Sequence, residues 1–242
     1  MKVASLSAQR RFMESVAAYV YAVVNEASDR TSGHVRGIGD YLALRRLTSG
    51  ARTSFFSVEL GLDIPEGVMV HPALESLVSL AEESTVLTNV CISSPPPSHT
   101  RRTAPTHKEP QDVYSYNNEQ AAGHGGHNIV TVVMNEKGVD LAGALDWVAE
   151  YHEDVLEKFQ AQRRMLPSWG PDMDAVVEAF AERLACWIRG HDCWSFESGR
   201  YFGSKGAEIQ KHRLATLLPS VTKQGVTPMM ARSVVQPSTS MH

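Results

Sequence analysis

Residues 128–137, NIVTVVMNEK, decide the fold class of this sequence. The run of Ile and Val is typical of a β-strand when it is taken alone. No other stretch of the chain offers it a partner strand, and a lone strand is not stable, so we interpret it as a helix. The next segment, LAGALDWVAEYHEDVLEKFQAQRR over 141–164, is a helix that Asp140 can cap. The sequence therefore predicts an all-α fold.

Apolar residues recur at spacings of three and four along most of the remaining chain, as Phe12, Val16, Val20 and Val23 do. This spacing is the signature of amphipathic helices. With the glycine, proline and capping signals that mark helix ends, it predicts helices over 10–27, 38–46, 53–60, 72–89, 112–123, 128–137, 141–164, 172–190 and 192–202.

Residues 90–111 interrupt this pattern. They contain five prolines, three of them consecutive, and almost no large apolar side chain, so no packed helix can contain them. Residues 219–242 are polar and contain proline and serine, which favours a flexible tail. We therefore expect one helical domain over 1–218, interrupted by an exposed insert at 90–111 and followed by the tail.

Composition excludes several classes of function. The net charge of −4 gives no electrostatic support for nucleic-acid binding. The apolar stretches are too short to cross a bilayer, so we expect no membrane insertion. Three cysteines provide no disulfide framework, and a reducing, cytoplasmic location is expected. Nothing in the sequence predicts an oligomeric state.

Oxygen-bearing side chains gather within residues 111–120, QDVYSYNNEQ. Ser115 and Glu119 are four residues apart, so they lie one turn apart on one helix face, and Gln111 lies four residues before Ser115. An amide, a hydroxyl and a carboxylate form a hard oxygen site that suits Mg²⁺, especially when phosphate oxygens complete the coordination. A solvated helix face has the same spacing, so the motif alone leaves both interpretations open.

This motif resembles the Asn-Asp-x-x-Ser-x-x-x-Glu motif of class I terpene synthases of the fungal (basidiomycete) sesquiterpene type, in which Asn, Ser and Glu bind Mg²⁺. The following HNIVTVVM also resembles these enzymes. If residues 90–111 are removed, Asn89 joins the next aspartate and the motif is complete. The resemblance thus implies metal ligation by Asn89, Ser115 and Glu119, with Gln111 as the alternative to Asn89.

The insert has the features of a translated, retained intron. Val90-Cys91-Ile92 can be encoded by a sequence that begins GTATGT, and Gln111 by CAG, which are common fungal splice signals. The insert also differs in composition from everything around it. Sequencing of the genomic locus and the transcript tests this hypothesis, and a spliced transcript that keeps these codons would make the insert a feature of the protein.

Two basic elements also match this family. Arg46, followed by Gly50 in YLALRRLTSG, resembles its diphosphate-sensing arginine, with Arg45 as the rival assignment. Arg200-Tyr201 resembles the pair that closes over the diphosphate, and the planar donor fork of arginine suits phosphate oxygens. Without the metal motif, each element has an ordinary alternative, such as a surface arginine pair at the end of a helix.

The resemblance implies an all-α, class I terpenoid synthase-like bundle that corresponds to about the last two-thirds of a family member, truncated at the N-terminus. It implies a lyase that ionises and cyclises a prenyl diphosphate, farnesyl diphosphate in this family, with Mg²⁺. Phe55 and Phe56, together with the nearby Gly50, are candidates to line a carbocation pocket, because aromatic faces attract cations. Packing in the core is the more frequent role of such residues.

The Asp-rich metal motif of this family does not occur before Arg46 in the sequence. Asp172-Met173-Asp174 and Glu153-Asp154 lie downstream and are better interpreted as a helix start and a solvated face. We therefore expect this chain to be inactive as written. The alternative hypothesis is a non-catalytic helical remnant that at most binds diphosphate or a protein partner.

Overall fold

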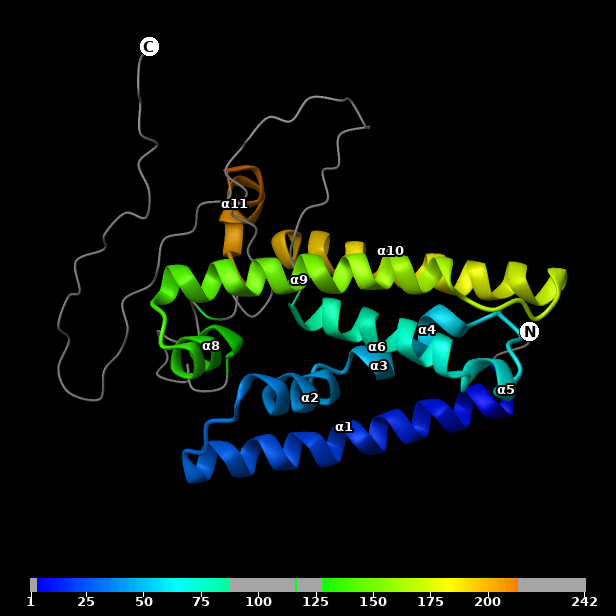
Figure 1. The fold of residues 1–242 in the computed structure, drawn as a ribbon, viewed down its shortest axis with the longest axis horizontal. Coiled ribbons are helices and arrows are strands. Elements are labelled where there is room, and N and C mark those ends of the chain that lie inside the picture. The colour runs from blue at the N-terminus through cyan, green and yellow to red at the C-terminus, as the bar shows by residue number, and fades with distance from the viewer. Residues whose placement is uncertain (1–3, 88–115, 117–127, 213–242) are drawn as a thin grey trace, which may run out of the picture.

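The computed structural model describes residues 4–87, Tyr116 and residues 128–212. Every regular element in these ranges is helical, which confirms the all-α prediction (Figure 1). The insert at 90–111, the tail at 219–242 and, apart from Tyr116, the helix expected over 112–123 lie outside the described residues, so the predicted division into domain, insert and tail stays a prediction.

The helices are arranged in two halves along the chain. The first half contains α1 (Leu6–Ser32), α2 (Ile38–Thr48), α3 (Ala51–Ser54), α4 (Phe56–Glu59), α5 (Glu66–Met69) and α6 (Pro72–Leu87). The second half contains α8 (Ile129–Lys137), α9 (Leu141–Arg164), α10 (Pro171–Glu197), the 3₁₀ turn η2 (Gly203–Lys205) and α11 (Gly206–His212).

The segment that decided the fold class is a helix, as expected. The side chain of Asn128 caps α8 by accepting a hydrogen bond from the amide of Val130 at 3.0 Å. Asp140 caps α9 in the same way, through the amide of Gly143 at 2.9 Å. Val130, Val132 and Val133 are all buried, so the β-branched run reflects burial on several sides of a core helix.

Several of the predicted helix boundaries were wrong. The two helices expected over 172–190 and 192–202 are one helix, α10, which continues through Gly190 and ends at Glu197. The buried Ile188, Asp192 and Ser195 carry its packed face across the glycine. The helix expected over 53–60 is instead two single turns, α3 and α4, on either side of Phe55.

Another correction concerns α1, which begins at Leu6 rather than at residue 10 and continues past the expected end at residue 27 to Ser32. The hydroxyls of Thr31 and Ser32 donate to carbonyls one turn back, which lets these turn-forming residues remain helical. Gly33, at φ 68°, then ends the helix in the left-handed conformation that glycine favours.

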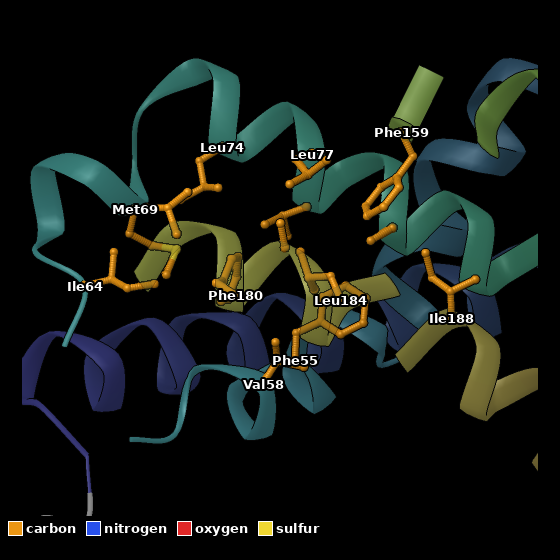
Figure 2. Packing of buried hydrophobic residues seen from close by; sticks show 14 of the residues in the cluster. Phe55, Val58, Ile64, Met69, Leu74, Leu77, Phe159, Phe180, Leu184 and Ile188 are labelled. Carbon is orange, nitrogen blue, oxygen red and sulfur yellow. The ribbon is translucent and has the colours of Figure 1, made fainter. Parts of the chain in front are cut away.

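The apolar core consists of two clusters that share α6. The first joins α3–α6 to α10, with Phe55, Leu77 and Leu184 at its centre (Figure 2). The second joins α2, α8 and α9 to Leu87 at the end of α6. α9 packs along both α6 and α8, while α1 packs against α2 and α3 at the edge of the bundle (Figure 1). None of the helices described combines the length and the apolarity that a membrane span requires.

Two glycines are required by the geometry. Gly50 lies at φ 71°, so it turns the chain between α2 and α3 in a conformation that disfavours other residues. Gly206 begins α11 so close to α10 that a Cβ atom there would lie 1.8 Å from the carbonyl oxygen of Phe196. The first glycine sets the end of the helix that carries Arg46, and the second holds the corner after Arg200 against α10.

Candidate functional site

The second half of α6 carries four consecutive polar residues that are almost fully buried. Glu82 and Glu83 are only 5% and 7% exposed, and Ser84 and Thr85 follow them. Carboxylates are found at this depth only when other groups satisfy their charge. The partners of these two glutamates define the candidate site.

Glu83 joins three helices through hydrogen bonds. Arg46 of α2 donates from Nη1 to Oε2 of Glu83 at 2.8 Å. The hydroxyl of Tyr151, on α9, donates to the other carboxylate oxygen. Burial, and next the hydrogen bond to Glu83, raise the pKa of Tyr151 above its usual value, so this hydroxyl keeps its proton and remains a donor. The predicted diphosphate sensor is thus held against α6 by a buried carboxylate.

Glu82 has a different arginine partner. Arg52 of α3 donates to both carboxylate oxygens of Glu82, and its Nη1 lies 2.9 Å from each carboxylate oxygen of Glu75. Burial raises the pKa of Glu82, and the hydrogen bond from Arg52 opposes this effect. This cluster ties α3 to α6 next to Arg46.

Arg200 and Tyr201 lie at the corner that follows α10. The guanidinium carbon of Arg200 is 5.9 Å from the centre of the Trp194 ring and 5.6 Å from that of Tyr201. These distances are those of cation–π contacts. The predicted pair is therefore adjacent in space, with aromatic faces holding the arginine.

His191, one turn before Trp194, has a lowered pKa. Burial, and next the positive charge of Arg200, lower its pKa to about 4. The unfolded chain binds this proton with the ordinary pKa of about 6.5. Between pH 4 and pH 6.5 the unfolded state binds more protons than the folded state. Protonation of His191 therefore lowers the free energy of unfolding as the pH falls from 6.5 toward 4, and it has no effect above pH 6.5.

We expect the His191→Gln variant to lose less stability on acidification than the unmodified chain. Between pH 7.5 and pH 5 the difference should be about 2 kcal/mol in the free energy of unfolding, measured with urea. His34→Gln, at an exposed histidine, is the matched control. Equal pH dependence of the unmodified chain and His191→Gln would show that burial of His191 does not affect its proton affinity.

The predicted metal ligands Asn89, Ser115, Glu119 and Gln111 lie outside the described residues. α6 ends its described part at the buried Leu87, two residues before Asn89. Within the ranges that the structure describes, no group of three or more His, Cys, Asp or Glu side chains could hold a metal ion. The amide, hydroxyl and carboxylate oxygens of the predicted set fit the hard ligands that Mg²⁺ prefers.

The three predicted pocket residues, Phe55, Phe56 and Gly50, lie in different surroundings. Phe55 is buried in the first core cluster, where its ring lies edge-on to Trp187 with centroids 6.0 Å apart. Phe56 packs on Phe12 of α1 at 4.8 Å between ring centroids. Gly50 forms the turn after α2. Arg46, Arg200, Tyr201 and the metal motif are expected to face one cavity, and this stays a prediction from the sequence.

Sequence reasoning missed Glu82, Glu83 and Tyr151. One signal was available, because two glutamates interrupt an otherwise apolar, packed pattern in LVSLAEESTVL. Acidic residues at core positions of a helix indicate buried ion pairs or a functional site. The partner tyrosine had no comparable signal, since its position depends on how α9 packs on α6.

This helical bundle has the fold of class I terpene synthases. A solved α-eudesmol synthase matches it with a TM-score of 0.65 at 22% identity, over 81% of this chain and 57% of that one. A linalool/nerolidol synthase from Streptomyces clavuligerus matches with a TM-score of 0.65 at 20% identity, over 79% of this chain and 60% of that one. At such identities the likeness establishes the fold alone.

The family follows from the sequence comparison. Residues 1–158 match the model of terpene synthase family 2, C-terminal metal binding, and the chain belongs to this family. It is similar to sesquiterpene synthase 14 of Postia placenta, with 42% identity over 91% of this chain and 57% of that protein. It is also similar to Δ6-protoilludene synthase of Armillaria gallica, with 39% identity over 95% of this chain and 60% of that protein.

These relatives confirm the resemblance to fungal sesquiterpene synthases on which the sequence analysis relied. The chain spans slightly less than two-thirds of the length of the curated relatives that it matches.

Proposed function

We propose that this chain is the metal-binding part of a sesquiterpene synthase, which binds a prenyl diphosphate with Mg²⁺ and ionises and cyclises it. The observation that carries the proposal is the placement of Arg46. Among the residues that the structure describes, one carboxylate binds this arginine, that of Glu83 on α6, whose described part ends two residues before Asn89. The names of the relatives support a sesquiterpene product and hence farnesyl diphosphate as substrate.

The assignment of Arg46 is supported by its contact with the buried Glu83, which fixes its position. Its planar donor fork can grip two oxygens of one phosphate. Arg200 and Tyr201 would add donors from the far end of α10. Bound Mg²⁺, held by Asn89, Ser115 and Glu119, would neutralise the diphosphate and make it a better leaving group.

The protein's contribution after ionisation is shape and exclusion of water. An allylic cation survives only where water cannot reach it and where aromatic faces stabilise its charge. The packed aromatic residues near α3 and α4, among them Phe55 and Phe56, are the candidates for this wall. Cyclisation and proton loss then follow inside the apolar enclosure.

Replacement of Arg46 tests the proposal. We expect Arg46→Met to weaken binding of inorganic pyrophosphate in the presence of Mg²⁺ by about tenfold to a hundredfold, because charged hydrogen bonds to the anion are lost. Isothermal titration calorimetry measures this. Arg30→Met, on the exposed end of α1, is the matched control and should bind as the unmodified chain does. Equal affinity in both variants would remove Arg46 from the site.

A further inference from the structure

We propose that Glu83, supported by Tyr151, is the positioning residue for Arg46: it anchors one nitrogen of the guanidinium and leaves the opposite edge free for a diphosphate. This inference rests on the proposed function, because it assigns a role to a neighbour of the proposed diphosphate ligand. It adds two residues, from α6 and α9, to a site that the sequence motifs place on other segments.

The first argument is how Arg46 uses its donors. Nη1 donates to Glu83, while Nε and Nη2 make no hydrogen bond to any residue that the structure describes. Nε and Nη2 form one of the edges through which arginine grips two phosphate oxygens at once. The Arg46 side chain is 34% exposed, whereas that of Glu83 is 10% exposed. The anchoring carboxylate is therefore buried, while about a third of the arginine side chain remains exposed.

The second argument comes from the neighbouring arginine. Arg52 also pairs with buried acid on α6, but all three of its nitrogens are bound, Nε and Nη2 to Glu82 and Nη1 to Glu75. Arg52 is thus saturated and has a structural role. Glutamates of α6 thus bind all three nitrogens of Arg52 but only Nη1 of Arg46. This difference suits a structural role for Arg52 and a ligand-binding role for Arg46.

The third argument is what holds Glu83. A carboxylate with one partner could swing, but the hydroxyl of Tyr151 binds its second oxygen. Tyr151 is in turn stacked on Trp147, with ring centroids 5.0 Å apart and an interplanar angle of 9°. The chain of contacts from α9 through α6 to α2 therefore fixes Arg46 before any ligand arrives. A guanidinium that is already ordered loses less conformational freedom on binding.

The test must separate the loss of the anchor from the loss of a negative charge, because Glu83 is negative and the proposed ligand is an anion. Removal of the charge alone would strengthen anion binding, whereas removal of the anchor would weaken it. Glu83→Gln removes the charge and keeps an oxygen that accepts from Arg46. Glu83→Ala removes both, and Tyr151→Phe removes only the supporting hydroxyl. The three variants separate positioning from simple charge repulsion.

The test is titration of the full chain with inorganic pyrophosphate and Mg²⁺, with each affinity referred to the folded fraction measured by circular dichroism. We expect Glu83→Ala to bind about fivefold to tenfold more weakly and Tyr151→Phe about twofold to fivefold more weakly, the scale of ordering one flexible side chain. Glu83→Gln should bind at least as tightly as the unmodified chain. Glu14→Ala, which removes the same charge at an exposed position of α1, and Tyr21→Phe, at an exposed tyrosine, should leave the affinity unchanged.

A double-mutant cycle identifies Arg46 as the residue through which Glu83 acts. The penalty of Glu83→Ala should disappear when Arg46 is already Met. Persistence of the penalty in the Arg46→Met background, or tighter binding by Glu83→Ala, would overturn the inference and leave the proposed function intact. No measurable binding by the unmodified chain would instead contradict the proposed function, and the inference with it.

Discussion

Incubation of the 242-residue chain with farnesyl diphosphate and Mg²⁺ is expected to give no measurable sesquiterpene. The sequence has no Asp-rich motif before Arg46 to hold further metal ions, and one metal ion neutralises a diphosphate too weakly to trigger ionisation. The insert also separates Asn89 in the sequence from Ser115 and Glu119. Gln111 is one methylene longer than asparagine and follows Pro110, which favours a new helix start there.

Gas chromatography of the extracted volatiles measures this result. A chain lacking 90–111 should remain inactive, and turnover should appear only when the remaining part of a family member is supplied as well. Postia placenta sesquiterpene synthase 14, 42% identical over the shared region, is a suitable donor of that part and a positive control. Robust sesquiterpene production by the 242-residue chain alone would mean that another acidic cluster replaces the Asp-rich motif.

Arg52→Met should be among the most destabilising substitutions in the described part of the chain. It leaves the carboxylate of Glu82, which is 5% exposed, without its partner, and loss of one member of a buried ion pair costs about 3–5 kcal/mol in the free energy of unfolding. Burial already raises the pKa of Glu82, and removal of Arg52 raises it further. The loss should therefore shrink as the pH falls and Glu82 takes up a proton.

Urea denaturation at pH 7 and pH 5 checks this prediction. Arg163→Met is the matched control, because Arg163 also pairs with two glutamates, but those side chains, Glu178 and Glu182, are each 58% exposed. Its loss should be below about 1 kcal/mol, as for other exposed pairs. Comparable losses in the two variants, or a loss in Arg52→Met that does not change with pH, would contradict the account of the buried cluster.

The helices that could be predicted are those whose ends carry local signals. α9 begins after the capping Asp140 and ends at Arg164, where it was expected, because cap and periodicity agree. The prediction divided α10 into two helices at Gly190, because glycine weakens a helix locally. The packing that keeps this glycine helical comes from residues distant in the sequence. The 3₁₀ turn and α11 were not predicted, and the close approach of Gly206 to Phe196 that holds them is a tertiary contact.

Some residues of the candidate site could be predicted from local motifs, and others could not. Arg46, Arg200 and Tyr201 were predicted from short motifs that keep their meaning without knowledge of the packing. Glu83 and Tyr151 were missed, because their importance arises only when α6, α2 and α9 come together. The metal ligands that the motif implies remain a prediction from the sequence and from the family to which the chain belongs.

The most direct test of the central claim is the Mg²⁺ dependence of pyrophosphate binding in the chain with and without residues 90–111. Deletion joins Asn89 to Asp112 in the sequence and completes the metal motif. Because Mg²⁺ demands near-octahedral oxygen ligands at about 2.1 Å, we expect calorimetry to show tighter binding after deletion, only when Mg²⁺ is present, and loss of this gain in Glu119→Gln. Binding that is equal in both chains, or that does not depend on Mg²⁺, would contradict the assignment of Asn89, Ser115 and Glu119 as the metal site.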